Sequence, residues 1–218
     1  MKKKLLMRLA AAALAVGMCL SSAGASYFTD VSPNSWYYGA AMECASYGLM
    51  NGYDDGSFRP NANVTRAECA QILSNINPEW RAEIIYYDVD SSKWYRNVVS
   101  HYGTYMGGTY TDTKHTTPFG YREYFYPNRA CTREDFVYGV GNVIGISTDN
   151  NYSYFDDWAS INPNYVDVIN NVYTSIANAI LGIDVAQRVE VFKPIILSKN
   201  MTMDLAVFSD VFNLVKHM

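Results

Sequence analysis

The chain has 218 residues and carries 17 Lys and Arg against 21 Asp and Glu, a formal net charge of −4 at pH 7. This acidic balance argues against nucleic acid as a partner and against nonspecific adhesion to anionic walls or lipids, because the overall charge would repel them. A chain of this length can bury a hydrophobic core without disulfides or metals, as one large domain or several small ones.

The first 25 residues have the pattern of a secretory signal peptide. Four basic residues precede an apolar run over 9–20, and Ala23 and Ala25 suit cleavage before Ser26. The run is too short to span a bilayer, and no later stretch reaches the roughly 20 apolar residues of a membrane helix. A lipid anchor on Cys19 is disfavoured, because a bulky residue precedes it. The expected mature chain is secreted, is not in the membrane, and keeps 13 basic against 21 acidic residues, a net charge of −8.

The mature chain has three cysteines, at positions 44, 69 and 131, and their spacing fits no metal site. Cys44 and Cys69 both fall on predicted inward positions of helices. We therefore expect buried free thiols, with a disulfide between Cys44 and Cys69 as the alternative.

Three segments share one pattern, which indicates an internal repeat. Each opens with aromatic residues, an acid and a turn-rich stretch, starting at Tyr27, Tyr86 and Tyr154, and each continues with a helical pattern. The predicted organisation is a signal peptide at 1–25 and repeats at 26–80, 81–148 and 149–218.

The first helix of each repeat is predicted from small and apolar residues at positions i, i+1, i+4, i+5 and i+8, which form one face of an α-helix. These stripes run from Ala40 to Gly48, from Val98 to Met106 and from Val168 to Ile176. Four residues before the stripe stand Trp36 in the first repeat and Trp94 in the second. The third repeat has Asn164 there, so it lacks the Trp.

A second helix is predicted after an aromatic-x-Pro tripeptide, because proline favours an extended chain just before it. In the first repeat Thr65 is the expected N-cap, and Glu68 completes a capping box. Thr132 and Asp135 occupy the same positions in the second repeat. In the third repeat Thr202 keeps the cap, but no acid follows three residues later.

The residue after the cap is Arg66 in the first repeat and Arg133 in the second, and Met203 in the third. An Arg is unexpected there, because a helix N-terminus is already positive. The unpaired N–H groups of a helix start suit a carboxylate or phosphate, which a guanidinium can grip with two hydrogen bonds. We therefore predict that Arg66 and Arg133 bind an anion. The alternative is an exposed Arg paired with a nearby acid.

The segments between the two helices differ from repeat to repeat. In the first repeat, Gly56 follows two Asp residues and is expected to take a positive φ in a tight turn. In the second repeat, the longer insertion at 107–124 has residue types that alternate along the chain, which is typical of the strands of a β-hairpin. The predicted fold is mainly α, with one short hairpin in the second repeat.

These residues resemble the S-layer homology domain, a module that attaches many bacterial surface proteins to the cell wall. The resemblance rests on Phe-x-Asp-Val, a Trp six residues after that Asp, the loop Gly-Tyr-x-Asp-Gly-x-Phe-x-Pro and the sequence Val-Thr-Arg-Ala-Glu at 64–68. The match is strong in the first repeat, weaker in the second because of its loop, and mainly positional in the third.

The resemblance implies three helix-loop-helix repeats with pseudo-threefold symmetry in one compact unit, and grooves between neighbouring repeats. In the family, such grooves bind a secondary cell-wall polysaccharide, typically one with a pyruvate ketal whose carboxylate meets the motif Arg. Carried over, the polysaccharide-binding residues of this chain are Arg66, Arg133, Asp30, Asp88, Trp36, Trp94 and Gly56. The third repeat is expected to lack a working site.

Several of these residues also have a simpler explanation. Trp36 and Trp94 can stack on a sugar ring, but a Trp just before a helix stripe more often packs in the core, which is the expectation here. Asp30 and Asp88 are most simply turn or cap acids, which could instead hold an Arg or a sugar hydroxyl.

No catalytic or metal-binding pattern is found in the sequence, so we expect neither an enzyme nor a cofactor. The leading hypothesis is a secreted, non-enzymatic protein of the surface layer that anchors to wall polysaccharide, with other surface proteins as further candidate partners. A structural or protein-interaction module that keeps the fold but has lost glycan binding is the alternative.

Overall fold

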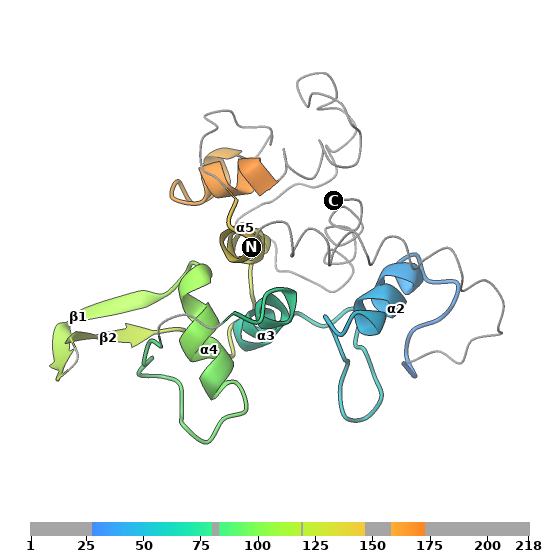
Figure 1. Cartoon of the computed structure of the whole chain (residues 1–218), viewed down its shortest axis with the longest axis horizontal. Coiled ribbons are helices and arrows are strands. Elements are labelled where there is room, and N and C mark those ends of the chain that lie inside the picture. The colour runs from blue at the N-terminus through green and yellow to red at the C-terminus, as the bar shows by residue number, and fades with distance from the viewer. Residues whose placement is uncertain (1–27, 80–82, 119, 147–157, 173–218) are drawn as a thin grey trace. The chain divides into compact units, whose positions relative to one another are not determined.

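The computed structural model describes residues 28–79, 83–118, 120–146 and 158–172 (Figure 1). The predicted signal peptide and the second helix of the third repeat, with Thr202 and Met203, lie outside these residues. The described chain belongs to two compact units, 28–62 in the first and 63–172 in the second. Helices predominate, and the only strands within the described ranges form one two-stranded sheet. The predicted helix-rich class is thereby confirmed, and the threefold arrangement of repeats stays a prediction.

The first unit is built on α2 (Tyr38–Ser46) and the loop that follows it. The helix buries Ala40, Ala41 and Cys44, as the stripe predicts. The stripe does not continue as a buried face to Gly48, which is exposed, because the helix ends at Ser46. Beyond the helix, the ring of Phe58 packs against that of Phe28 with centroids 4.8 Å apart.

The second unit packs α3 (Arg66–Ile76) against α4 (Arg96–Tyr102) and α5 (Arg133–Ile144) (Figure 1). Each helix contributes a fully buried side chain to the core: Leu73, Val99 and Phe136. A short 3-10 turn, η2 (Gly103–Tyr105), continues α4 and also contacts α5. The second helix of the first repeat therefore shares its core with the second repeat.

On its other side, α5 packs against the first helix of the third repeat, which is helical at 166–172 and follows η3 (Trp158–Ser160). A Cβ on Gly141 would lie 2.4 Å from Val168 Cγ1, so only glycine permits this close approach. Val168, Ile169 and Val172 are buried, which confirms the described part of the third stripe.

The insertion of the second repeat forms the predicted hairpin, with β1 (Tyr110–Thr117) antiparallel to β2 (Gly120–Tyr124). The two strands project as an arm away from α4 (Figure 1). An irregularity between Asp112 and Thr116 interrupts the register, and β1 buries none of its residues. The base of the hairpin is attached to the second unit by a hydrogen bond of 2.7 Å from the amide of Tyr87 to the carbonyl of Glu123.

Candidate functional site

The start of α3 has the predicted capping box. The hydroxyl of Thr65 accepts a hydrogen bond from the amide of Glu68 at 3.3 Å, and the Glu68 carboxylate accepts one from the amide of Thr65 at 2.7 Å. These two bonds satisfy backbone donors that the helix itself cannot pair. The capping box thus defines where Arg66 emerges from the backbone.

The remaining amides at this helix start are not available to a ligand. Arg66 donates its backbone N–H to the carbonyl of Arg129 at 2.9 Å, and Ala67 donates to that of Pro127 at 3.0 Å. The segment that precedes α5 therefore caps α3. The prediction that the amides of this helix start receive an anion is wrong for α3, because the second repeat supplies carbonyl oxygens in the anion's place.

The Arg66 side chain is fully buried. Its Nη1 donates to Oδ2 of Asp135 at 2.8 Å, and its Nε donates to the carbonyl of Phe125 at 2.8 Å. The guanidinium also lies over the Phe125 ring, 4.6 Å from the centroid. Arg66 is therefore paired with an acid, as the alternative reading allowed, but inside the core and not on the surface.

Arg129 joins this ion pair from the solvent side, and we call Arg66, Arg129 and Asp135 the arginine cluster. The Nη2 of Arg129 lies 3.7 Å from Oδ2 of Asp135, and the Arg129 side chain is 49% exposed. Gly108 lies against all three side chains, since a Cβ there would come within 2.7 to 3.2 Å of each. The cluster has two guanidinium groups for one carboxylate, an excess of one positive charge.

One donor of the arginine cluster is left over. The Nη2 of Arg66 is buried and has no hydrogen-bond partner among the described residues. A buried donor without a partner costs about 1–3 kcal/mol, and more when it is charged. Such an atom is a reason to look for a bound group that the chain itself does not supply.

The start of α5 repeats the cap but not the whole capping box. The hydroxyl of Thr132 accepts from the amide of Asp135 at 3.1 Å, as predicted. The Asp135 carboxylate pairs with Arg66 and does not return to its own helix start. Arg133 is half-buried at the position that corresponds to Arg66. The third-repeat segment that would correspond to Phe125 and Arg129 lies outside the described residues.

Asp30 in the first repeat and Asp88 in the second accept equivalent hydrogen bonds from the backbone. The two oxygens of Asp30 accept from the amides of Phe58 and Arg59 at 2.7 and 2.8 Å. Those of Asp88 accept from the amides of Phe125 and Tyr126 at 2.9 and 2.7 Å. Both carboxylates thus fasten the aromatic-x-Pro tripeptide, which confirms that they are turn acids.

The middle residue of this tripeptide has an unusual backbone. Arg59 and Tyr126 have φ values of 57° and 58°, a left-handed conformation that costs a residue with a Cβ about 1–2 kcal/mol. The extended chain predicted before the proline is therefore wrong, because the Asp carboxylate binds two successive amides and bends the backbone.

Trp36 and Trp94 are exposed by 65% and 63%, so the core position considered for them is wrong. Each packs edge-on against the tyrosine that follows it, with centroids 5.5 Å apart for Trp36 and Tyr37 and 5.2 Å for Trp94 and Tyr95. The tyrosines hold the indoles in place, and a face of each indole stays available to a ligand.

Gly56 has the predicted positive φ, 76°, and its carbonyl accepts from the amide of Thr29 at 2.9 Å.

Cys44, Cys69 and Cys131 are buried free thiols, so the alternative disulfide is not formed. Within the described ranges, no group of three His, Cys, Asp or Glu side chains is placed to hold a metal ion. No helix of the described chain combines the length and the apolar character that a membrane span needs.

Comparison with known protein families finds a match in the first repeat. The S-layer homology domain matches residues 27–70, which include Asp30, Trp36, Gly56 and Arg66. This segment of the chain is similar to the S-layer homology domain. The matched segment ends inside α3, so the S-layer homology match contains Arg66 but not Asp135, its partner from the second repeat.

Two relatives are surface proteins. The chain is 27% identical over 156 residues to the surface-layer 125 kDa protein of Lysinibacillus sphaericus, which covers 71% of this chain and 12% of the relative. It is 41% identical over 49 residues to cell surface glycoprotein 1 of Acetivibrio thermocellus, which covers 22% of this chain and 2% of the relative. The chain therefore corresponds to only a small part of either protein.

Proposed function

We propose that this chain is a non-catalytic anchoring module of the cell surface, which binds an acidic polysaccharide of the cell wall through the arginine cluster. The S-layer homology match and the two surface-protein relatives support a location at the cell surface or cell wall. The observation that carries the proposal is the arginine cluster itself, in which Arg66 has a buried Nη2 without a hydrogen-bond partner among the described residues and Arg129 shares Asp135 from a half-exposed position.

The chemistry of the cluster suits a carboxylate on a sugar. Arg129 is open to solvent and can take one carboxylate oxygen, while Arg66 behind it adds charge that solvent screens little. Because the chain as a whole is acidic, an anionic polymer would be repelled except where positive charge is concentrated. We therefore assign the acidic group of the polymer, of which a pyruvate ketal is one form, to the arginine cluster.

The other predicted site residues have different parts in this proposal. Trp36 and Trp94 present exposed indoles that can lie on the apolar face of a sugar ring. Asp30, Asp88 and Gly56 shape the loops and do not need to touch the ligand. Arg133 is proposed to serve a second site of the same kind, with partners from the third repeat.

A surface module that has lost glycan binding is the second candidate, and one observation favours it. Arg66 is already paired with Asp135 at 2.8 Å and fully buried, so the motif can persist for stability alone. In that case the arginine cluster would have no ligand, and surface attachment would depend on another protein.

The test is binding of the purified protein to isolated wall sacculi, before and after removal of their polysaccharide. The diagnostic variant is Arg129→Gln, and its matched control is Arg59→Gln, since both arginine side chains are 49% exposed and lie over a tyrosine ring. Loss of a charge-assisted contact of about 1.5–3 kcal/mol predicts weakening of at least about tenfold for Arg129→Gln only. Equal binding by both variants would refute the site, and binding to stripped sacculi would favour the protein-interaction module.

A further inference from the structure

At the base of the hairpin three tyrosine rings pack around a fourth, and the proposed function does not use them. We call Tyr87, Tyr110, Tyr124 and Tyr126 the tyrosine cluster. The ring of Tyr124 lies at its centre, with centroids 5.5 Å from Tyr87, 6.1 Å from Tyr110 and 6.2 Å from Tyr126. The first repeat has no counterpart to the insertion that supplies two of these rings.

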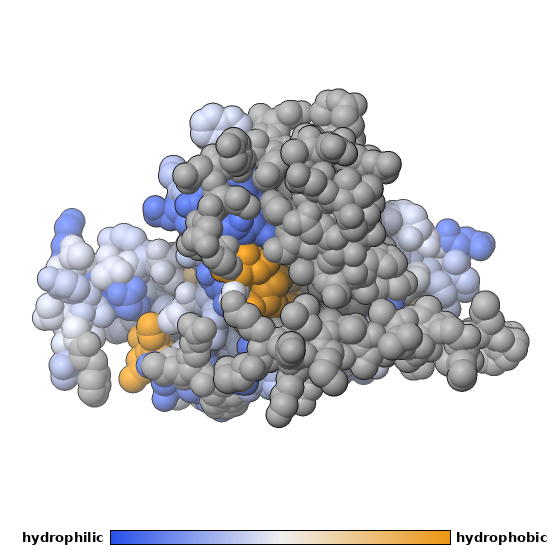
Figure 2. Space-filling model, turned by 45° about the horizontal axis from the view of Figure 1, so that its top comes forward, coloured by the Kyte–Doolittle hydropathy of each residue, from blue (hydrophilic) through white to orange (hydrophobic). Residues whose placement is uncertain are grey.

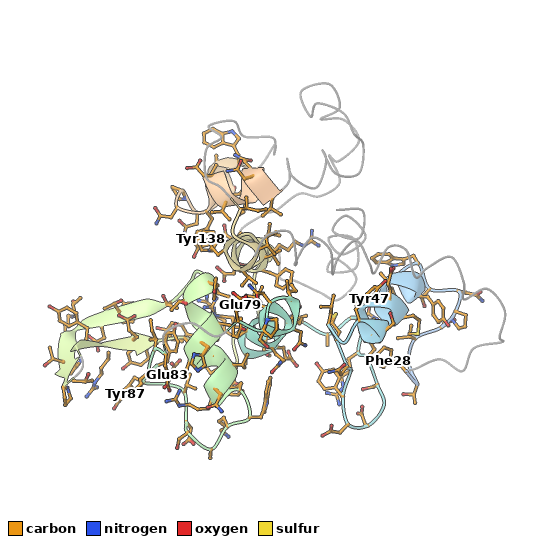
Figure 3. The ribbon with its side chains drawn as sticks, viewed as in Figure 1. Phe28, Tyr47, Glu79, Glu83, Tyr87 and Tyr138 are labelled. Carbon is orange, nitrogen blue, oxygen red and sulfur yellow. The ribbon has the colours of Figure 1, made fainter. Side chains whose placement is uncertain are left out.

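The three outer rings remain open to solvent although each packs against Tyr124. Tyr87 is 58% exposed, Tyr110 is 52% exposed and Tyr126 is 38% exposed. Figure 3 shows Tyr87 beside the hairpin, on the segment that leads into α4. Cross-strand packing of Tyr110 on Tyr124 can stabilise the arm by itself. That role does not account for the exposed ring of Tyr87, which lies outside the hairpin.

Two guanidinium groups border the tyrosine cluster. The guanidinium carbon of Arg122 lies 4.3 Å from the centroid of Tyr87, and the Arg122 Nε is buried without a hydrogen-bond partner in the described chain. Arg129 lies 5.5 Å from the centroid of Tyr126 and belongs to the arginine cluster as well. The aromatic surface is therefore continuous with the proposed site for the acidic group.

We propose that the tyrosine cluster is a second sugar subsite, on which the polysaccharide chain continues after its acidic group has bound the arginine cluster. This inference rests on the proposed function and extends it. Aromatic rings offer apolar faces to the C–H faces of sugars, and their hydroxyl groups and the flanking guanidinium groups can meet sugar hydroxyls and acidic substituents. The hairpin thus enlarges the binding surface and does not block it.

The surroundings favour a polysaccharide over an apolar protein partner. The outer part of the arm is white to blue in Figure 2, so its visible face is polar. Two cationic groups lie beside the rings of a chain whose net charge is negative, which is complementary to a polymer that carries acidic groups.

The experiment compares polysaccharide fragments of graded length. Cold hydrofluoric acid releases the probe from walls of Lysinibacillus sphaericus and Acetivibrio thermocellus, and size fractionation separates short from long fragments. Affinities of the full chain are measured by titration calorimetry. The diagnostic variant is Tyr87→Ser with Tyr110→Ser, and the matched control is Tyr121→Ser, whose ring is 53% exposed on β2 outside the tyrosine cluster. Circular dichroism checks that each variant is folded.

We expect the double variant to bind long fragments about tenfold more weakly than the parent and short acidic fragments equally well. The Arg129→Gln variant should bind both kinds of fragment more weakly. If the double variant and Tyr121→Ser bind long fragments like the parent while Arg129→Gln does not, the second subsite is refuted and the arginine cluster stands. If the parent binds no fragment, the proposed function and this inference fail together. A double variant that changes only self-association would also refute the inference.

Discussion

Removing the carboxylate of Asp135 should destabilise the second unit more than removing the guanidinium that it pairs with. Asp135→Ala leaves Arg66 as a buried charge with only the carbonyl of Phe125 as its acceptor. Breaking one side of a buried ion pair costs about 3–5 kcal/mol. The side chains of Arg66 and Asp135 are 0% and 5% exposed, so solvent cannot replace the lost partner.

Arg66→Met should cost less, because Asp135 then keeps a second cation. The Nη2 of Arg129 lies 3.7 Å from the same Asp135 oxygen, and its side chain is 49% exposed, so we expect it to approach further when Arg66 is removed. The long apolar side chain of methionine also fills much of the space that the arginine leaves. We expect a loss of about 2 kcal/mol, below the cost of Asp135→Ala.

The double variant Arg66→Met with Asp135→Ala isolates the pair from its surroundings. It leaves no buried charge of the pair without its partner, and Arg129 is half-exposed to solvent, so its loss of stability should be smaller than the two single losses together by about 1–3 kcal/mol. Urea unfolding, followed by circular dichroism and by fluorescence, measures all four proteins. With a slope of roughly 2 kcal/mol per molar urea, the midpoint of Asp135→Ala should fall by roughly 1.5–2.5 M. Additive losses within about 0.5 kcal/mol, or a harmless Asp135→Ala, would show that the ion pair is not the central contact of this unit.

Three further predictions concern packing and ionisation. Gly107→Ala should destabilise the protein, because the new Cβ would lie 1.4 Å from the Tyr165 hydroxyl. Gly39→Ala in α2 meets nothing within 4 Å and should raise the free energy of unfolding by about 0.5–1 kcal/mol. Thermal melting of both variants tests this pair of predictions. Burial raises the pKa of Tyr86 from 10.0 to about 12. Between pH 10 and about pH 12 the unfolded chain therefore loses a proton that the folded chain keeps, and the free energy of unfolding should fall as the pH rises. Urea titrations at several pH values should show a smaller fall for Tyr86→Phe than for the parent. Burial also raises the pKa of the Cys69 thiol, so a thiol reagent should label it only after unfolding, and rapid labelling of the native protein would contradict the structure.

The helix starts and tight turns were predictable because they depend on residues close in sequence. Thr65 and Glu68 cap α3 through bonds that span three residues, and Gly56 takes its positive φ inside a four-residue turn. The hairpin was predictable for the same reason, since its strands are joined by a short connection. The first helices were predictable from stripes of small and apolar residues, most of which face inward.

The burial and the partners of the predicted site residues depend on contacts between residues far apart in the sequence, which no local pattern contains. The exposure of Trp36 and Trp94 follows from their packing against Tyr37 and Tyr95, which leaves the indoles outside the core. Arg129 was missed, although an Arg just before a cap and just after an aromatic-x-Pro tripeptide was a visible sign. Asp135 was assigned to its own capping box, because sequence spacing gave no hint of a partner 69 positions away.

The helix-rich class, the caps, the turns and the position of Arg66 at a helix start follow from the sequence alone, since short-range hydrogen bonds and one-sided burial specify them. The tertiary structure alone decided what Arg66 meets there. The segment before α5 covers the start of α3, takes its amides and brings Asp135 and Arg129 to the guanidinium. A carboxylate partner was needed at this helix start, because a buried cation requires one. The fold supplies it from the second repeat, and one donor of Arg66 has no partner among the residues that the structure describes.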